Sequence, residues 1–235
     1  AGLDELRGEL GRLARSLPVP PADADVRLWL DRAFTVRGRG TVVTGTLGAG
    51  TLRVGDRLLT GDGTAELRVR GMQCLHEERT TVTGVARVAV DVHGAADATL
   101  RRGQVLLSPD RWLLTAQTDV RVTGEPVADL PRASTLHIGT ASVPVTVRPL
   151  GEDTARLTLG RPLPLRVGDR AVLREPGGTR VPCAVTVLDV RPPRLELRPP
   201  GSRGPENSRR VGDRTHRGTA PATGRRRGPV TLIPM

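Results

Sequence analysis

The chain has 235 residues, long enough for one large domain or two small ones, and 37% of them are hydrophobic, enough to form a core. All 36 basic residues are arginine, against 25 acidic residues, and the formal net charge is +11. The absence of lysine excludes a phosphate-binding loop of the GxxxxGK(S/T) type and Schiff-base chemistry. Aromatic residues make up only 1% of the chain, so the core must consist mainly of Val, Leu and Ala.

No apolar run approaches the ~18–20 residues that a membrane-spanning helix needs, and no secretory signal opens the chain. The two cysteines, Cys74 and Cys183, lack the CxxC spacing of a zinc site. The histidines are not spaced as metal ligands either; they are His76, His93, His137 and His216. We therefore expect a reduced, cytoplasmic protein with no membrane partner and no metal, and no Ser-His-Asp or Cys-His arrangement indicates a catalytic residue.

The first predicted element is a helix over residues 3–17. Its leucines follow one another at spacings of three and four, which places them on a single helical face: Leu3, Leu6, Leu10, Leu13 and Leu17. We interpret residues 1–17 as the remnant last helix of a domain that precedes this chain. Residues 18–24 contain the run Pro-Val-Pro-Pro, which ends the helix and predicts a stiff linker.

From residue 26 the apolar period changes to the alternation typical of strands, beginning with Val26, Leu28 and Leu30. Clusters of Gly, Pro and Asp separate further short strand-like runs at intervals of roughly 8–12 residues. This rhythm predicts an all-β fold of two antiparallel barrels, one over residues 25–112 and one over residues 113–195. A short repeat supports two barrels, because Leu52–Arg57 recurs as Leu165–Arg170. We interpret the repeat as a common barrel turn, and a third RVGDR at residues 210–214 as chance.

Residues 196–235 differ in composition from the rest of the chain. They contain nine arginines and only three acidic residues, with few apolar side chains. Such a segment cannot bury enough surface to offset its ordering entropy, so a disordered tail is predicted. A basic tail of this kind binds RNA non-specifically through phosphate contacts; the other interpretation is a by-product of a shifted reading frame that binds nothing.

The most informative segment reads DRAFTVRGRGTVVTGTLGAG, at residues 31–50. It predicts a strand, a turn at Gly38 and Gly40, and a β-branched second strand. Gly45 then marks a bend or a close approach of two backbones. Arg37 and Arg39 project from this turn, so they are candidate contacts to an RNA backbone.

This segment resembles the second-domain signature of translational GTPases such as elongation factor Tu, in which a barrel follows the GTPase domain. The wider sequence resembles the selenocysteine-specific elongation factors over residues 1–195. The matching stretches are GLDELR near the start, VRLWLDRAFTVRGRGTVVTGTL at 26–47, RVRGMQCL at 68–75, ARVAVDVHG at 86–94, RRGQVLL at 101–107, the long stretch at 136–178 and AVTVLD at 184–189.

The resemblance implies two barrels of the elongation-factor-Tu type and a role in translation. Members of this family bind GTP with magnesium, and deliver selenocysteinyl-tRNA to the ribosome at a UGA codon marked by an mRNA hairpin. Their GTPase domain precedes the barrels, and a winged-helix region that reads the hairpin follows them; neither pattern is present in this sequence. We therefore expect a monomer without enzymatic activity or cofactor of its own, whose partners are selenocysteinyl-tRNA, the ribosome and the missing GTPase domain.

The resemblance also implies a pocket for the selenocysteinyl group, formed by Asp31, Arg32 and Arg87. A selenol is more acidic than a thiol, whose pKa is about 8.5, so two guanidiniums would favour the selenolate over the serine hydroxyl. Neighbouring residues of a strand point to opposite faces, so Asp31 and Arg32 can share a pocket only near a bulge or a strand end. Without the resemblance, the same residues describe an ordinary surface ion pair.

The favoured hypothesis is thus the tRNA-binding double barrel of a selenocysteine-specific elongation factor. Two other hypotheses stay open at this point. One is a stand-alone, non-catalytic module that binds RNA or the ribosome, and the other is an inactive truncation product.

Overall fold

The computed structural model describes residues 2–36, 40–94, 100–178 and 181–194. Arg37, Gly38 and Arg39 lie outside this range, as do the predicted tail and the third RVGDR copy at 210–214. The described residues up to Pro193 form one compact unit. Within the described part of the chain, no helix has the length and apolar character that crossing a membrane requires.

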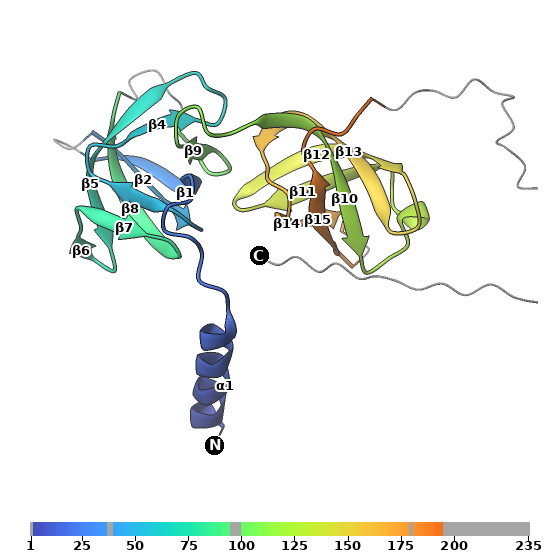
Figure 1. Cartoon of the computed structure of the whole chain (residues 1–235), viewed down its shortest axis with the longest axis horizontal. Helices are drawn as coiled ribbons and strands as arrows, with labels where there is room; N and C mark the ends of the chain where they lie inside the picture. The colour runs from blue at the N-terminus through green and yellow to red at the C-terminus, as the bar shows by residue number, and fades with distance from the viewer. Residues whose placement is uncertain (1, 37–39, 95–99, 179–180, 195–235) are drawn as a thin grey trace, which may run out of the picture. The chain divides into compact units, whose positions relative to one another are not determined.

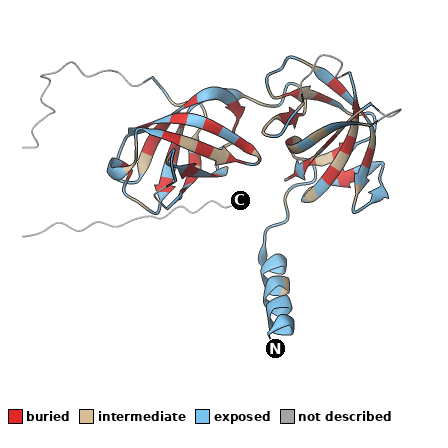
Figure 2. Cartoon of the chain, turned by 180° about the vertical axis from the view of Figure 1, so that it is seen from behind, coloured by how far each residue is buried: buried red, intermediate tan, exposed pale blue. Residues whose placement is uncertain are grey.

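The predicted N-terminal helix is present as α1, over Leu3–Ser16. Asp4 and Glu5 lie in its first turn and Arg15 in its last, which suits the helix dipole. None of its residues is buried, and the leucine face is exposed (Figure 2).

The first barrel contains a seven-stranded antiparallel sheet with the order β4-β9-β1-β2-β8-β5-β6 (Figure 1). Pairing of β4 with β5 closes the ring of strands. The strands of this sheet are β1 (Arg27–Val36), β2 (Gly40–Leu47), β4 (Arg57–Thr60), β5 (Glu66–Cys74), β6 (Glu77–Glu78), β8 (Ala86–His93) and β9 (Val105–Leu107). A separate two-stranded ribbon pairs β3 (Thr51–Arg53) with β7 (Thr81–Thr83).

The second barrel is a closed ring of six strands with the order β10-β13-β12-β11-β14-β15. A short 3-10 helix, Val127–Asp129, lies between its first two strands in the chain. The strands are β10 (Leu114–Thr123), β11 (Ala133–Ile138), β12 (Ala141–Pro149), β13 (Thr154–Pro164), β14 (Arg170–Arg174) and β15 (Cys183–Asp189). The prediction of two antiparallel barrels after a short helix is therefore confirmed, while the domain boundaries at 25, 113 and 196 stay predictions.

The buried residues of each barrel are mainly Val and Leu, with hardly any aromatic side chain, as the composition predicts. On β8, Val88, Val90 and Val92 are buried, while Arg87 and His93 are exposed. This alternation has the period of two expected for a strand with one face on a core. Cys183 is buried in the core of the second barrel.

The repeated sequence forms the same turn in both barrels. The carboxylate of Asp56 accepts a hydrogen bond from the backbone N–H of Arg53 at 2.7 Å, and Asp169 accepts one from Arg166 at 2.8 Å. The glycine that precedes each aspartate has a positive φ, 95° at Gly55 and 88° at Gly168, a conformation that favours glycine. The structure thus agrees with the interpretation of the repeat as a barrel turn.

Arg27, the first residue of β1, joins residues of the two barrels. Its two terminal nitrogens donate to the two carboxylate oxygens of Asp169 at 2.6 and 2.7 Å, and one of them also donates to the carbonyl of Pro164. The guanidinium carbon lies 4.8 Å from the ring centroid of Trp112, on which Arg166 also stacks at 3.8 Å. The Arg27 and Asp169 side chains are only 19% and 13% exposed, so the pair is largely shielded from water.

Removing one partner of this shielded pair should be costly, because the other charge is left uncompensated. We expect Arg27→Leu to lower the free energy of unfolding by about 3 kcal/mol, measured by urea denaturation. The matched control is Arg121→Leu, which breaks an ion pair with Asp153 whose side chains are 58% and 56% exposed. That change should stay within about 0.5 kcal/mol; equal losses in the two variants would contradict the structural role of Arg27.

Candidate functional site

Asp31 and Arg32 lie side by side on the outward face of the first barrel because β1 contains a bulge. Leu30 pairs with Gly45 and Arg32 with Thr44, so Asp31 is an extra residue with no partner of its own in the register with β2. An extra residue shifts the strand's alternation by one, so two consecutive side chains can face the same way. The bulge therefore meets the condition under which these two neighbours can share a site.

Gly45 allows β1 and β2 to approach each other closely at this bulge. A Cβ placed on Gly45 would lie 2.4 Å from the carbonyl oxygen of Trp29 and 3.1 Å from a methyl carbon of Leu28. Any side chain would collide with the β1 backbone, so only glycine suits the observed spacing. Of the other two turn glycines, Gly40 has a φ of 96° and Gly38 lies outside the described residues.

The carboxylate of Asp31 is the centre of the site. Arg87, on β8, donates from Nε to Oδ2 at 3.0 Å and from Nη2 to Oδ1 at 3.1 Å, which is a two-point guanidinium–carboxylate pair. Thr44, on the strand between them, donates its hydroxyl to Oδ1. The Asp31 side chain is 21% exposed and that of Arg87 is 62% exposed, so the arginine is open to a ligand.

The electrostatics of the site follow from these contacts. Partial burial tends to raise the pKa of Asp31, but hydrogen bonds from Arg87 and Thr44 and the charges of Arg87 and Arg32 outweigh burial and lower it. The hydrogen bond and charge of Asp31 raise the pKa of Arg87 in turn. The site therefore holds the ionised carboxylate of Asp31 beside the guanidiniums of Arg87 and Arg32.

The structure thus brings together Asp31, Arg32 and Arg87, while Arg37 and Arg39 fall in the part of the chain that is not described. The sequence analysis missed Thr44, which contacts Asp31 directly. The signal that identifies Thr44 is its place opposite the bulge, one residue before Gly45, where the two strands approach closely. Phe34, also on the outward face of β1, is 46% exposed.

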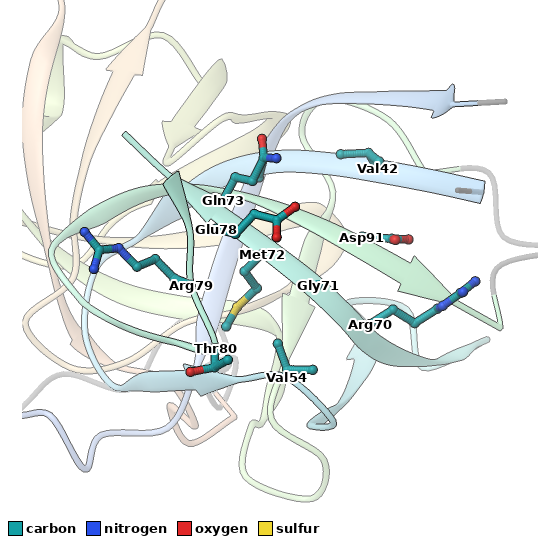
Figure 3. Close-up of a pocket in the computed structure, with 11 residues that line it drawn as sticks. Val42, Val54, Arg70, Gly71, Met72, Gln73, Glu78, Arg79, Thr80 and Asp91 are labelled. Atoms are coloured by element: carbon teal, nitrogen blue, oxygen red, sulfur yellow. The ribbon is translucent and has the colours of Figure 1, made fainter. Parts of the chain in front are cut away.

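A cavity of about 480 Å³ lies on the outward side of the same barrel (Figure 3). Arg87, Ala89 and Asp91 alternate along the outward side of β8, and the last two line this cavity. Val42 and Met72 supply apolar wall, and the remaining lining residues are Val54, Arg70, Gly71, Gln73, Glu78, Arg79 and Thr80. One carboxylate oxygen of Asp91, Oδ1, is buried without a hydrogen-bond partner among the described residues. The volume falls in the range of small-molecule sites.

The described residues contain no group of three or more His, Cys, Asp or Glu side chains that could hold a metal ion. The side chains on the outward face of the first barrel offer charge and hydrogen bonds to a ligand. An anion can bind beside the exposed guanidiniums, and an uncharged group of moderate size can enter the neighbouring cavity.

Comparison with known proteins finds relatives among elongation factors. The chain is 33% identical over 205 residues to the selenocysteine-specific elongation factor of Escherichia coli strain K12, a match that covers 85% of this chain and 32% of the relative. It is 32% identical over 187 residues to the selenocysteine-specific elongation factor of Desulfomicrobium baculatum, covering 74% and 29%. The chain thus spans about a third of the length of these curated relatives. No protein-family model matches the chain.

Solved structures share the fold. A bacterial selenocysteine-specific elongation factor superimposes with a TM-score of 0.70 at 21% identity, over 79% of this chain and 31% of the other. The apo form of elongation factor SelB from Methanococcus maripaludis superimposes with a TM-score of 0.66 at 22% identity, over 81% and 48%. These matches show that the chain shares its fold with solved elongation-factor structures.

The close approach at Gly45 yields a direct test of the site's geometry. Gly45→Ala should force the two strands apart and lower the free energy of unfolding by about 2 kcal/mol in urea denaturation. Gly48→Ala is the control, because a Cβ at Gly48 meets nothing within 4 Å. A Gly45 variant as stable as the Gly48 variant would show that the strands do not approach as described.

Proposed function

Over the part of their length that it spans, the chain is related to the selenocysteine-specific elongation factors, and on that premise we propose that it binds the aminoacyl end of selenocysteinyl-tRNA for selenocysteine incorporation. The observation that carries the proposal is the grouping of Arg32, Arg87 and Asp31 on one outward face. The first barrel would hold the esterified amino acid. The ribosome and a GTPase domain are the further partners this proposal implies, and the chain itself has no catalytic role in it.

The chemistry of the amino acid fits this site. A selenol is more acidic than a thiol, so selenocysteine is largely an anion at neutral pH while serine keeps its proton. Arg87 has five N–H donors, and Asp31 engages two of them, which leaves three for a ligand. Together with Arg32 they would bind a selenolate more tightly than a hydroxyl. Asp31 supplies the opposite charge that an esterified amino acid's ammonium requires.

The neighbouring cavity suits the nucleoside that carries the amino acid. Ala89 and Asp91 follow Arg87 along the outward face of β8 at two-residue steps of about 7 Å each. The distance from Arg87 to the first residue that lines the cavity, Ala89, is therefore comparable with the length of an aminoacyl ester. Its lining combines apolar wall at Val42 and Met72 with hydrogen-bonding groups such as Gln73. That combination is typical of sites that enclose a planar heterocycle. We therefore place the 3′-terminal adenosine of the tRNA in this cavity. Arg37 and Arg39 stay candidate contacts to the sugar-phosphate backbone of the tRNA.

The test of the aminoacyl site compares two tRNAs that differ only in the esterified amino acid. Arg87→Ala should weaken binding of selenocysteinyl-tRNA by roughly tenfold and leave seryl-tRNA nearly unchanged, because only the selenolate gains a charge-assisted contact. Equilibrium binding to the full chain gives both constants. Arg121→Ala is the control, since it also removes one positive charge from an exposed ion pair. Equal weakening of both tRNAs by Arg87→Ala would favour a general RNA-binding module instead.

The cavity makes a different prediction. Gln73→Ala should weaken selenocysteinyl-tRNA and seryl-tRNA by the same factor, because both carry the same terminal adenosine. The variant is neutral, so long-range attraction to RNA stays constant. Gln117→Ala, which removes an exposed glutamine from the second barrel, serves as the control. If the Gln73 variant bound both tRNAs as tightly as the control does, the adenosine would not lie in this cavity.

A further inference from the structure

The side chain of Asp31 needs an external contact to set its orientation. As the extra residue of a bulge it has no register partner on β2, so the strand ladder constrains it less than its neighbours. The terminal torsion of an aspartate is also intrinsically broad, with no strongly preferred rotation of the carboxylate. The two-point pair with Arg87, however, requires the carboxylate plane to face the guanidinium fork.

Thr44 has the geometry to supply that contact. It pairs with Arg32 on one side and with Ala89 on the other, so two ladders fix its backbone. Its β-branched side chain has few rotamers, and its hydroxyl donates to Oδ1 of Asp31. That oxygen also accepts from Nη2 of Arg87, while Oδ2 accepts from Nε. The threonine hydroxyl therefore helps to fix the rotation of the carboxylate plane that the two-point pair with Arg87 requires.

We propose that Thr44 is a positioning residue, which orients Asp31 so that its carboxylate holds Arg87 on the outward face that also carries Arg32. This inference rests on the proposed function, because it assigns to Thr44 a share in the preference for an anionic aminoacyl group. Thr44 acts through Asp31 and needs no contact with the ligand. Without its hydroxyl, the carboxylate turns, the two-point pair loosens, and Asp31 no longer holds the Arg87 guanidinium in place.

The variants that test this role separate the hydroxyl from the shape of the side chain. Thr44→Val keeps the branched shape and removes the donor, whereas Thr44→Ser keeps the donor. Thr46→Val is the matched control, because Thr46 lies two residues along β2 and its hydroxyl makes no hydrogen bond within the described residues. Thr44→Ala provides a second donor-free variant if the valine variant does not fold.

The first measurement is independent of tRNA. Carbon-13 NMR titration of the Asp31 carboxyl in the full chain should show a higher pKa in Thr44→Val than in wild type, because the carboxylate loses one hydrogen bond and its alignment with Arg87. Thr44→Ser should restore the wild-type pKa, and Thr46→Val should leave it unchanged. A pKa unmoved by Thr44→Val overturns the proposal, since a packing role alone would leave the titration as it is.

The second measurement is the ratio of affinities for selenocysteinyl-tRNA and seryl-tRNA. Thr44→Val should reduce that ratio by roughly three- to tenfold, with Thr44→Ser close to wild type. If Thr44→Val leaves this ratio unchanged, Thr44 does not contribute to the preference for selenocysteinyl-tRNA over seryl-tRNA. If the wild-type chain shows no preference between the two tRNAs while the Asp31 pKa responds as expected, the orientation of Asp31 by Thr44 stands and the proposed function fails.

Discussion

The bulge at Asp31 is the constraint on which the outward face of the first barrel depends. Before it, Leu28 and Leu30 face the core of the first barrel; after it, Ala33 packs on that core while Arg32 and Phe34 are exposed. An uninterrupted strand would place Arg32 on the same side as Leu28 and Leu30, in an interior that consists mainly of apolar side chains. One inserted residue thus puts an arginine outside, next to an aspartate that already faces outward. The site exists because the register of one strand is shifted by one position.

The chain has arginine but no lysine, and the fork geometry of the guanidinium recurs at several places in the structure. Arg27 with Asp169, Arg156 with Asp119, and Arg87 with Asp31 each form a two-point pair. The first two are largely buried; Arg156 is only 5% exposed, and its hydrogen bond to Asp119 raises its pKa. Arg87 is the exception at 62% exposure. The same interaction therefore serves the fold where water is excluded, and recognition where a guanidinium edge remains open.

Periodicity alone was enough to predict the helix and the all-β character of the rest. The leucine spacing of α1 and the alternation along β8 report local geometry, which a single segment contains in full. The site could be named only through a family resemblance, because Arg87 reaches Asp31 through the pairing of β1 with β2 and of β2 with β8. The alternation of apolar and polar residues also gives no sign of a bulge. It describes a single strand, whereas a bulge is defined by how two strands pair. Thr44 was missed for that reason: its role appears only once the shifted register places it against Asp31.

The bulge is itself held by contacts from outside its own hairpin. The backbone N–H of Leu30 donates to the carbonyl of Gln104 at 2.9 Å, and the Leu30 carbonyl accepts from Gly103 N–H at 3.1 Å. The same carbonyl accepts a hydrogen bond at 2.6 Å from the hydroxyl of Thr140, a residue of the second barrel. Three bonds therefore fix the residue directly before Asp31, and one of them crosses from the other barrel. Backbone N–H and C=O groups at a bulge lose their regular hydrogen-bond partners on the neighbouring strand. The three bonds to Leu30 replace such partners and stabilise the bulge at this position. The positions of Asp31 and Arg32 on the first barrel thus depend in part on a residue of the second.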